Sequence, residues 1–557
     1  MKKLFFLLLS VCLFSTPAVF SQNSKNPLPK NWYLQDRDST GIYGISLDKA
    51  YEFVKTKKLK SKQVLVAVID SGIDTLHEDL KSILWTNQKE IPGNGIDDDK
   101  NGYIDDVHGW NFLGGKDGRN VSKDSYEAAR VYNKLKMKYG SFLPDSTPAR
   151  PEEKEELEIF KKAQQIIVGD INPMEINLMK QLLPVFLKGD SVIAKDLGKT
   201  EYNYGDVSKY IAVNPDARKA KALIVQLYNG NGGDEITNKQ IIEEFDGQIR
   251  KADAADNAPE DYRKEIVQDD ETDINDRFYG NNDIMAGGPF HGTHCSGIIA
   301  AVRNNDKGID GIADNVRIMM VRAVPNGDEH DKDIALAIRY AVDNGAQIIS
   351  MSFGKQLSPE KQWVDDAVKY AEQHGVLLVL AAGNDSKNTD STTYFPSPVY
   401  KDGKGKANNW ITVGASGDPG NGGIVAKFSN YGKAGVDVFA PGVQIYSTLP
   451  GGNKYGNESG TSMACPVVAG TAAFILGYYP NLSASQLKYI IEKSARAPSE
   501  DVDIPGTEDR TSLSGISKTG GLLNAYSAIK LADTIEGEKK SNKELLPKSK
   551  LLKSKKG

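Results

Sequence analysis

The sequence is poor in histidine and cysteine, and no charge of either sign predominates. Its 557 residues include 6 histidines and 3 cysteines, and the formal net charge at pH 7 is −5. So small a charge, with no arginine-rich or aromatic-interleaved patch, argues against a protein that binds nucleic acid. Because histidine is so scarce, every histidine that falls within a motif becomes a candidate functional residue.

Long apolar runs are also few, and the first stands at the start of the chain. Lys2 and Lys3 precede an apolar run from Leu4 to Phe14, and a region containing Ser, Pro and Ala follows it. This order predicts a signal peptide over residues 1–21 and hence export, to the periplasm, the cell surface or the medium. The run is too short for a membrane anchor, and no charged stop follows it.

The three cysteines leave the redox state open. Cys12 lies inside the apolar run of the predicted signal peptide, a poor position for a lipid-modified cysteine, and Cys295 and Cys465 remain after cleavage. Free cysteines are often buried as small hydrophobic residues. An exported protein also permits a disulfide, and the spacing alone does not decide between the two.

The second long apolar run, Ser462–Tyr479, contains no charged residue and has small or apolar side chains on every face of a helix. Such a helix is buried in a large core or in a membrane. Pro466 and Gly470 interrupt the run and no basic residues flank it, so we predict a core helix. Its N-terminus would surround Ser462 with free N–H groups that favour a developing negative charge. A simple N-capping role for Ser462 is the alternative.

Two further stretches supply possible partners for this serine. Val64–Ile69 is a continuous apolar run that predicts a buried parallel strand, with Asp70 at its carboxyl end, where open α/β sheets place their sites. His291 opens a small, apolar helical segment. An Asp, a His and a Ser in this chain order are the partners of a nucleophilic triad.

Together these stretches resemble the subtilases, the subtilisin-like serine endopeptidases. The resemblance covers roughly residues 40–113 and 275–530. The segments that carry it are Asp70-Ser71-Gly72, His291-Gly292-Thr293-His294, Ser350-Met351-Ser352-Phe353-Gly354, Ala381-Ala382-Gly383-Asn384 and Gly460-Thr461-Ser462-Met463-Ala464.

The resemblance implies hydrolysis of peptide bonds in a peptide or protein substrate through an acyl-enzyme. Ser462 would be the nucleophile, His291 its general base, and Asp70 the group that orients the imidazole. Asn384 would donate its side-chain amide to the oxyanion. The substrate backbone would pair as an added strand with an edge formed by Ser352, Phe353 and Gly354.

His294 and Tyr394 have secondary places in this hypothesis. The resemblance assigns the base to His291, and we expect His294 to be buried and structural. A zinc site made of both histidines is disfavoured, because they are three residues apart with no glutamate between them. Tyr394 falls near the expected primary specificity pocket, where its bulk would narrow the space for a substrate side chain.

The pattern after the His motif predicts the fold class. Strand-like and helical segments alternate, which indicates an α/β fold with a doubly wound parallel sheet and right-handed crossovers. The expected strands are 316–324, 347–353, 376–382, 411–415 and 436–440, and the expected helices are 331–344, 359–374 and 483–495.

Residues 115–275, the insertion, are polar and charged and lie outside the resemblance. Apolar residues at helical spacing predict helices over 125–139, 152–168, 174–187 and 236–253, followed by an acidic loop over 256–276. We therefore predict a mainly helical inserted subdomain. Both of its ends would lie near the candidate site, and we hypothesise that it limits substrates to peptides or exposed loops. A purely structural role is the alternative.

An acidic stretch over residues 93–106 predicts a structural Ca²⁺ ion. Oxygen-bearing side chains at alternate positions, followed by a glycine, match the first half of a calcium loop, although the terminal bidentate glutamate is absent. A solvated acidic turn is the alternative. The predicted ligands are Asp97, Asp99, Asn101, the carbonyl of Tyr103, and Asp105.

The remaining segments complete the domain organisation. We expect an irregular arm over residues 22–44, a peptidase domain made of 45–114 and 276–535, and a disordered lysine-rich tail over 536–557. A short helix is expected over 46–57. The stretch between signal peptide and first strand leaves no room for the folded inhibitory propeptide that secreted subtilases usually carry.

Other functions remain compatible with these motifs. A subtilase fold without activity would serve as a binding module, and a peptide ligase or macrocyclase would use the same acyl-enzyme with an amine acceptor. An esterase is disfavoured, because the Gly-x-Ser-x-Gly elbow is missing around Ser462. Substrate specificity and oligomeric state are left open.

Overall fold

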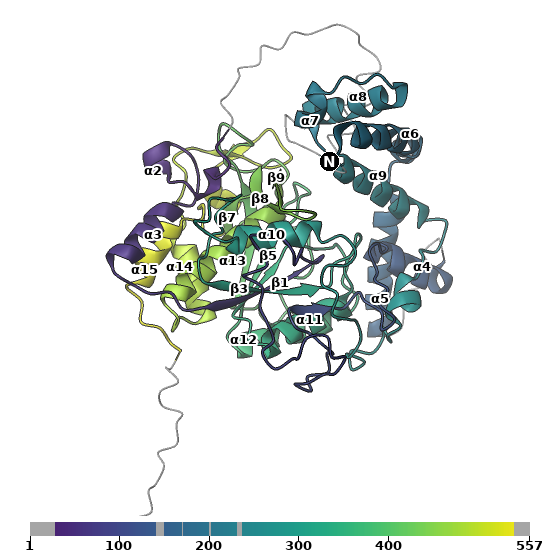
Figure 1. Cartoon of the computed structure of the whole chain (residues 1–557). Coiled ribbons are helices and arrows are strands. Elements are labelled where there is room, and N and C mark those ends of the chain that lie inside the picture. Colours follow the sequence, from purple (N-terminus) through teal and green to yellow (C-terminus); the bar gives the residue numbers. More distant parts are fainter. Residues whose placement is uncertain (1–27, 141–149, 170, 200–201, 231–236, 540–557) are drawn as a thin grey trace, which may run out of the picture.

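The computed structural model describes residues 28–140, 150–169, 171–199, 202–230 and 237–539. Within these residues the chain forms a central sheet with helices on both faces and a row of further helices along one side (Figure 1). The predicted signal peptide and most of the predicted lysine-rich tail lie outside the described residues.

The sheet has seven strands, all parallel, and so confirms the predicted α/β class with a doubly wound sheet. The order is β2-β3-β1-β4-β5-β6-β7. The strands are β1 (Val64–Asp70), β2 (Gly109–Asn111), β3 (Val316–Arg322), β4 (Ile348–Met351), β5 (Leu377–Ala381), β6 (Trp410–Ser416) and β7 (Val438–Pro441).

Helices cover both faces of the sheet because its strands are apolar on both sides. In β1, Val66 and Val68 pack into one apolar cluster, while Ala67 and Ile69 pack into the other. The first cluster contains α3 (Leu47–Thr56), α10 (Phe290–Ala300), α13 (Thr461–Tyr478), α14 (Ala484–Ser494) and α15 (Ala525–Ala532). The second contains α11 (Asp331–Asp343) and α12 (Lys361–Gln373).

Helix α13 lies at the centre of the first cluster. By length and composition it is the one helix among the described residues that would fit across a membrane, but 89% of it is buried inside the protein. Pro466 lies inside the helix, at its sixth residue, and cannot donate to the Ser462 carbonyl, which instead accepts from the Ser352 hydroxyl at 2.8 Å. The helix predicted over 462–479 is therefore a core helix, which begins at Thr461.

The arm before α3 is more ordered than predicted. It contains η1 (Trp32–Leu34) and α2 (Arg37–Thr40). Trp32 Nε1 donates to the Gln444 carbonyl at 3.3 Å, and Tyr33 is fully buried. Gln444 directly precedes the antiparallel hairpin formed by β8 (Ile445–Leu449) and β9 (Lys454–Glu458). The burial of two aromatic side chains against distant residues orders this arm, which local pattern did not reveal.

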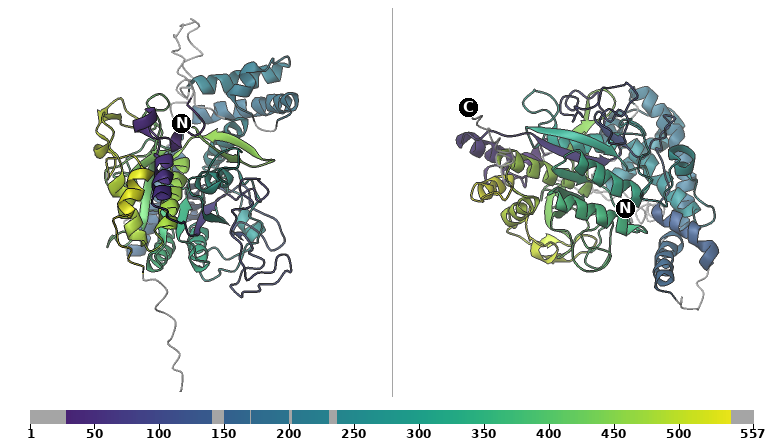
Figure 2. Two further views of the ribbon diagram at one scale, coloured as in Figure 1. Left: turned by 60° about the vertical axis from the view of Figure 1, so that its left-hand side comes forward. Right: turned by 90° about the horizontal axis from the view of Figure 1, so that it is seen from below.

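The insertion is mainly helical, and its helices lie together along one side of the sheet domain in the views of Figures 1 and 2. Two helices, α7 and α8, were not predicted. The full set is α4 (Glu127–Tyr139), α5 (Pro151–Gln164), η2 (Gln165–Gly169), α6 (Pro173–Leu197), α7 (Tyr204–Lys209), α8 (Pro215–Gly230), α9 (Asn238–Asp253) and η3 (Arg263–Val267). The predicted acidic loop thus contains one helical turn, η3.

Two apolar clusters hold the insertion together. One combines α4, α5 and η2 with Leu357 of the sheet domain, and the other combines α6, α7, α8 and α9. At the two ends of the insertion, Val121 and Val267 belong to the core cluster of β1 and α11. The ends are therefore part of the sheet domain, and only the helices between them form a separate layer.

Candidate active site

The three predicted catalytic side chains come together at one edge of the sheet. Asp70 is the last residue of β1, His291 is the second residue of α10, and Ser462 is the second residue of α13. Helices α10 and α13 pack against each other and against β1. Because all strands are parallel, their carboxyl ends share this edge, which is where open α/β sheets hold their sites.

Asp70 and His291 form a hydrogen-bonded pair. The His291 Nδ1 atom lies 2.8 Å and 3.0 Å from the two carboxylate oxygens of Asp70, and the Ser71 backbone N–H donates to the same carboxylate at 2.7 Å. The Asp70 side chain is 2% exposed and that of His291 36%. Burial opposes the charged imidazole, but the Asp70 carboxylate outweighs this effect and holds the pKa of His291 well above its usual value.

The Ser462 hydroxyl donates to the Ser352 carbonyl at 3.2 Å. Among the described residues it has no hydrogen bond to His291, a common situation before substrate binds, since catalytic hydrogen bonds tighten in the complex. The Ser462 backbone N–H lies in the first turn of α13, where such groups have no partner within the helix.

Asn384 lies beside Ser462 at the end of β5. Its Oδ1 atom accepts from the Thr461 N–H at 2.9 Å and from the Thr461 hydroxyl at 3.0 Å. These bonds fix the amide, so that its Nδ2 donor lies on the side of Gly460. The Asn384 amide and the Ser462 backbone N–H thus provide two hydrogen-bond donors that lie close together at the edge of the sheet.

Two supporting residues were not predicted from the sequence. Thr461 orients Asn384, and Asn430 fixes the turn that carries it. The Asn430 Nδ2 donates to the Ala382 carbonyl at 2.9 Å, while its Oδ1 accepts from the Asp385 N–H at 3.0 Å. Gly383 has φ +99°, and a Cβ atom there would lie 2.4 Å from Asn430 Nδ2, so only glycine fits. A single sequence offers no signal that Asn430 would reach this turn.

A small cavity of about 90 Å³ adjoins Ser462. The residues of the predicted substrate edge, Ser352, Phe353 and Gly354, line it, and so does Tyr394, which was predicted to lie near the specificity pocket. The lining consists of Ser352, Phe353, Gly354, Leu380, Ala381, Ala382, Gly383, Asn384, Tyr394, Phe395, Thr461 and Ser462. Burial and the nearby Asp385 carboxylate raise the pKa of Tyr394 above its usual value, so the phenol stays neutral.

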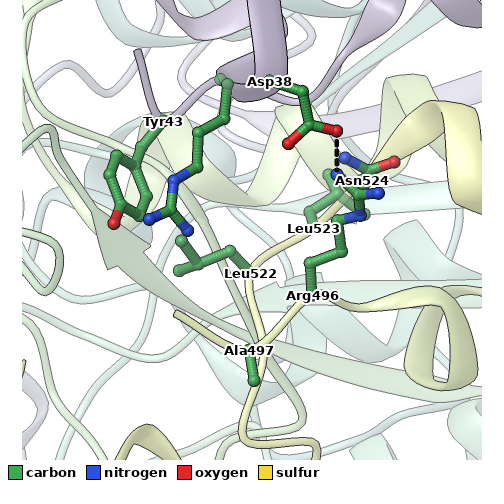
Figure 3. Close-up of a pocket in the computed structure, with 9 residues that line it drawn as sticks. Asp38, Tyr43, Arg496, Ala497, Leu522, Leu523 and Asn524 are labelled. Atoms are coloured by element: carbon green, nitrogen blue, oxygen red, sulfur yellow. Dashed lines mark hydrogen bonds and ion pairs between the residues drawn. The ribbon is translucent and has the colours of Figure 1, made fainter. Parts of the chain in front are cut away.

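A larger cavity of about 270 Å³ lies elsewhere, between the arm and the segment before α15 (Figure 3). Among its lining residues, Arg496 donates to Asp38 at 3.0 Å, and the Arg37 guanidinium lies over the Tyr43 ring. No residue of the Asp70–His291–Ser462 group lines this cavity, so its size does not mark it as the site.

The other candidate residues near the site are structural. His294 is fully buried, and burial lowers its pKa to about 3, so the ring is neutral. Both Cys295 and Cys465 are free and buried, which resolves the open question of a disulfide. Burial raises the pKa of Cys465 to about 12, which disfavours a reactive thiolate.

The predicted calcium loop brings together only some of its expected ligands. Carboxylate oxygens of Asp97 and Asp99 lie within 4.8 Å of one another and of Glu90, which the sequence pattern did not single out. The Asp105 carboxylate instead accepts from the N–H groups of Gly93 at 2.7 Å and Gly95 at 2.9 Å.

Asn101 and Tyr103 lie in the same turn. The Asn101 Oδ1 atom accepts from the Tyr103 N–H at 2.8 Å. The Asn101 amide donates to Asp106 at 3.1 Å, so the loop is closed by its own hydrogen bonds around the group of Glu90, Asp97 and Asp99.

Comparison with known proteins places the chain in a family. The model of the subtilase family matches residues 61–519, so the chain belongs to the subtilases. The thermophilic serine proteinase of Bacillus sp. (strain AK1) is 40% identical over 240 residues, which are 43% of this chain and 52% of that protein.

Two other relatives cover similar shares of the chain. Thermitase of Thermoactinomyces vulgaris is 38% identical over 253 residues, 45% of this chain and 79% of thermitase. The cell wall-associated protease of Bacillus subtilis (strain 168) is 34% identical over 276 residues, 47% of this chain and 29% of that protein. The chain spans about half the length of the Bacillus AK1 relative.

The pKa of His291 leads to a prediction on pH dependence. Under the hypothesis that His291 is the general base of a peptidase, the imidazole acts when neutral, so kcat/KM for a peptide should rise with pH through the pKa of His291, above the usual histidine range. In Asp70→Asn the charge that raises this pKa is gone, so the inflection should move to lower pH. The maximal kcat should also fall by about 10⁴-fold, because the imidazole tautomer is no longer fixed.

The measurement is a pH profile of kcat/KM for both proteins. Asp124→Asn is the matched control, because Asp124 pairs with His330 at 2.9 Å outside this group. Its inflection should stay at the wild-type pH. An Asp70→Asn profile with an unchanged inflection would show that another group is titrating.

Proposed function

We propose that the protein is a serine endopeptidase that hydrolyses peptide bonds through an acyl-enzyme. The observation that carries this proposal is the Asp70–His291 pair on the same sheet edge as Ser462. Membership of the subtilase family supports it, as do relatives named as serine proteinase and protease.

Each residue of the site has a chemical role in the proposed reaction. Ser462 Oγ attacks the scissile carbonyl while His291 Nε2 takes its proton, and the imidazolium then protonates the leaving amine. Asp70 holds the tautomer through Nδ1 and stabilises the imidazolium. Asn384 Nδ2 and the Ser462 N–H donate to the oxyanion, and one such donor contributes roughly 2.7–4 kcal/mol. Water then attacks the acyl carbonyl while His291 Nε2 takes its proton, and the imidazolium returns a proton to Ser462 Oγ as the carboxylic acid leaves.

The substrate segment before the scissile bond pairs, in this proposal, with the edge of Ser352, Phe353 and Gly354. The adjoining cavity accepts the side chain that precedes the bond. At about 90 Å³, with an apolar lining and Tyr394 as one wall, it favours small apolar side chains.

Two alternatives share this geometry. A peptide ligase or macrocyclase would use the same acyl-enzyme but release it to an amine, and only the products distinguish it from a hydrolase. An inactive binding module would need none of the hydrogen bonds that orient His291 and Asn384. Their presence favours a working enzyme.

We also infer that the chain is exported. The predicted signal peptide supports this inference, and one relative is named as a cell wall-associated protease. Peptides or proteins outside the cytoplasm would then be its substrates.

A structural Ca²⁺ ion fits the acidic loop of residues 90–106. Glu90, Asp97 and Asp99 offer carboxylate oxygens, the ligands that Ca²⁺ prefers, within 4.8 Å of one another. Lys89 is the cation that pairs with this group, with its Nζ 3.8 Å from Asp99, so three carboxylates share one positive charge. We propose that these three residues hold the ion, which would stabilise the loop by offsetting their repulsion.

We further propose that the insertion limits access to Ser462. Lys162 of α5 lies 5.6 Å from the ring of Phe395, which lines the cavity. Gln240 of α9 donates to Glu458, which stands four residues before Ser462. Two contacts of the insertion so close to the nucleophile favour extended chains over folded proteins as substrates.

Ser462 provides the direct test of the proposed function. A fluorophosphonate probe should label the wild-type protein at Ser462, and Ser462→Ala should lose both the label and about 10⁶-fold in kcat. Ser459→Ala is the matched control, since this nearby serine hydroxyl accepts from the Gln444 N–H and has no catalytic role here. It should keep label and activity. Hydrolysis that survives in Ser462→Ala would exclude the serine mechanism.

Bound calcium should raise the melting temperature of the protein. A ligand that binds only the folded state stabilises it, by about 2.7 kcal/mol at a hundredfold excess over Kd, so a chelator should lower Tm. Asp99→Ala should abolish the chelator effect. Asp105→Ala should lower Tm, because Gly93 and Gly95 lose their acceptor, yet keep the effect. A chelator shift of equal size in Asp99→Ala would reject the proposed ligands.

Access can be tested by removing the outer helices. Replacing residues 171–253 with a Gly/Ser linker removes α6, α7, α8 and α9, and with them the Gln240 contact, but keeps α4, α5 and the ends that join the sheet domain. Cleavage of native ribonuclease should rise relative to its reduced, carboxymethylated form, with little change for a tetrapeptide anilide. An unchanged ratio in a folded variant would mean that the helices are only scaffold.

A further inference from the structure

Lys355 is a buried cation that adjoins the proposed substrate edge. It follows Gly354 directly, and its side chain is 1% exposed. Its backbone forms an antiparallel bridge with Phe395, with N–H···O distances of 2.8 Å in both directions. Because Gly354 and Phe395 both line the cavity next to Ser462, this bridge fixes one wall of it.

The Lys355 ammonium group joins three segments of the chain. It donates to Glu127 of α4 at 2.7 Å and to the Glu329 carbonyl at 2.7 Å, and it lies 2.9 Å from Asp331. All three hydrogens of the ammonium group therefore have acceptors. One of the two carboxylates that neutralise it, Glu127, comes from the insertion.

Glu127 in turn is held by the insertion and by the loop that precedes α11. Arg130 donates to its carboxylate at 2.8 Å. The same guanidinium donates to the carbonyls of Asp328 at 3.1 Å and Glu329 at 3.2 Å. The Glu127 N–H donates to the Asp328 carboxylate at 2.8 Å. This loop leaves β3 beside the site, so α4 connects two segments of the same sheet edge.

The energetics of such a cluster make each member necessary. The Glu127 side chain is 10% exposed and Arg130 15%, so the charges are largely removed from water. Removing Glu127 leaves Asp331 as the one carboxylate in contact with Lys355 among the described residues and takes a carboxylate partner from Arg130, and such a loss costs more in a buried cluster than an exposed pair is worth. Without Glu127, the wall at Lys355 would rearrange to find another acceptor.

We propose that Glu127, although it belongs to the insertion, is a positioning residue of the substrate-binding edge and acts through Lys355. This inference rests on the proposed function, since it concerns the edge that pairs with a peptide. It assigns the insertion a second role, in which α4 helps to build the cleft. Glu127 does not touch the reacting atoms, so its loss affects peptide binding and leaves the reactivity of Ser462 intact.

The test measures binding without turnover. Kd for a fluorescent hexapeptide is compared between Ser462→Ala and the double variant Ser462→Ala/Glu127→Gln. The double variant should bind about 10-fold more weakly, a part of the cost of a buried charge without its partner. In the active protein, Glu127→Gln should raise KM by a similar factor with kcat within about twofold. Labelling of Ser462 by a small fluorophosphonate, which does not use the edge, should keep its rate.

Glu156→Gln is the matched control. Glu156 pairs with Lys138 at 2.8 Å in the same pair of helices, but its side chain is 35% exposed, so Kd and KM should not change. If Glu127→Gln does not fold, Glu127→Gln/Lys355→Met removes both charges together. This double variant should fold again. It should still bind peptide more weakly, because residue 355 no longer connects the cavity wall to α4 and to the loop before α11.

The outcomes separate this inference from the proposed function. Equal Kd values with and without Glu127→Gln overturn the positioning role alone. A parallel fall of kcat and of the labelling rate also overturns it, since that indicates general damage to the site. A wild-type protein that reacts with the probe but neither binds nor cleaves peptides overturns the proposed function, and this inference with it.

Discussion

The structure depends on the placement of one buried carboxylate at the end of a buried strand. Asp70 is enclosed between the apolar faces of β1 and the start of α10, and its charge is met by His291 and by the Ser71 N–H. A carboxylate that is buried away from water needs hydrogen-bonding or charged partners of fixed geometry. The parallel arrangement of the strands provides them, because every loop that follows a strand returns to the same edge. Asn384 and the edge at Ser352 arrive there for the same reason.

The apolar helix α13 brings Ser462 to the same edge of the sheet from within the core. Its charge-free sequence allows it to pass through the middle of the core, and its first turn emerges at the sheet edge, where the Ser462 N–H has no acceptor within the helix. The first residues of α13 are thus fixed by the burial of the whole helix. Ser462 needs no flexible loop to reach the site, and its position is as well defined as the core itself.

The sequence predicted the sheet, the core helix and the three central candidate residues because each combines a strong local pattern with a polar residue at its end. It did not predict Glu90 or Glu127, because their roles arise from tertiary contacts. Glu127 meets Lys355 across 228 positions of sequence. Helix α7 was missed although Asn203 and Asp206 form a capping box, because six residues show too little periodicity. The order of the arm around Trp32 was not predicted, because it comes from burial against Gln444.

The position of the insertion also bears on how the chain folds. Asp70 and His291 are separated by 221 positions, and most of the intervening chain lies between β2 and α10. Closing so long a flexible loop is entropically costly and slow. Helices that pack locally, as α6, α8 and α9 do, form early and shorten the effective loop. The Asp70–His291 pair therefore forms after the insertion has become compact, and a nascent chain has an assembled site only when Ser462, later in the chain, has joined this pair.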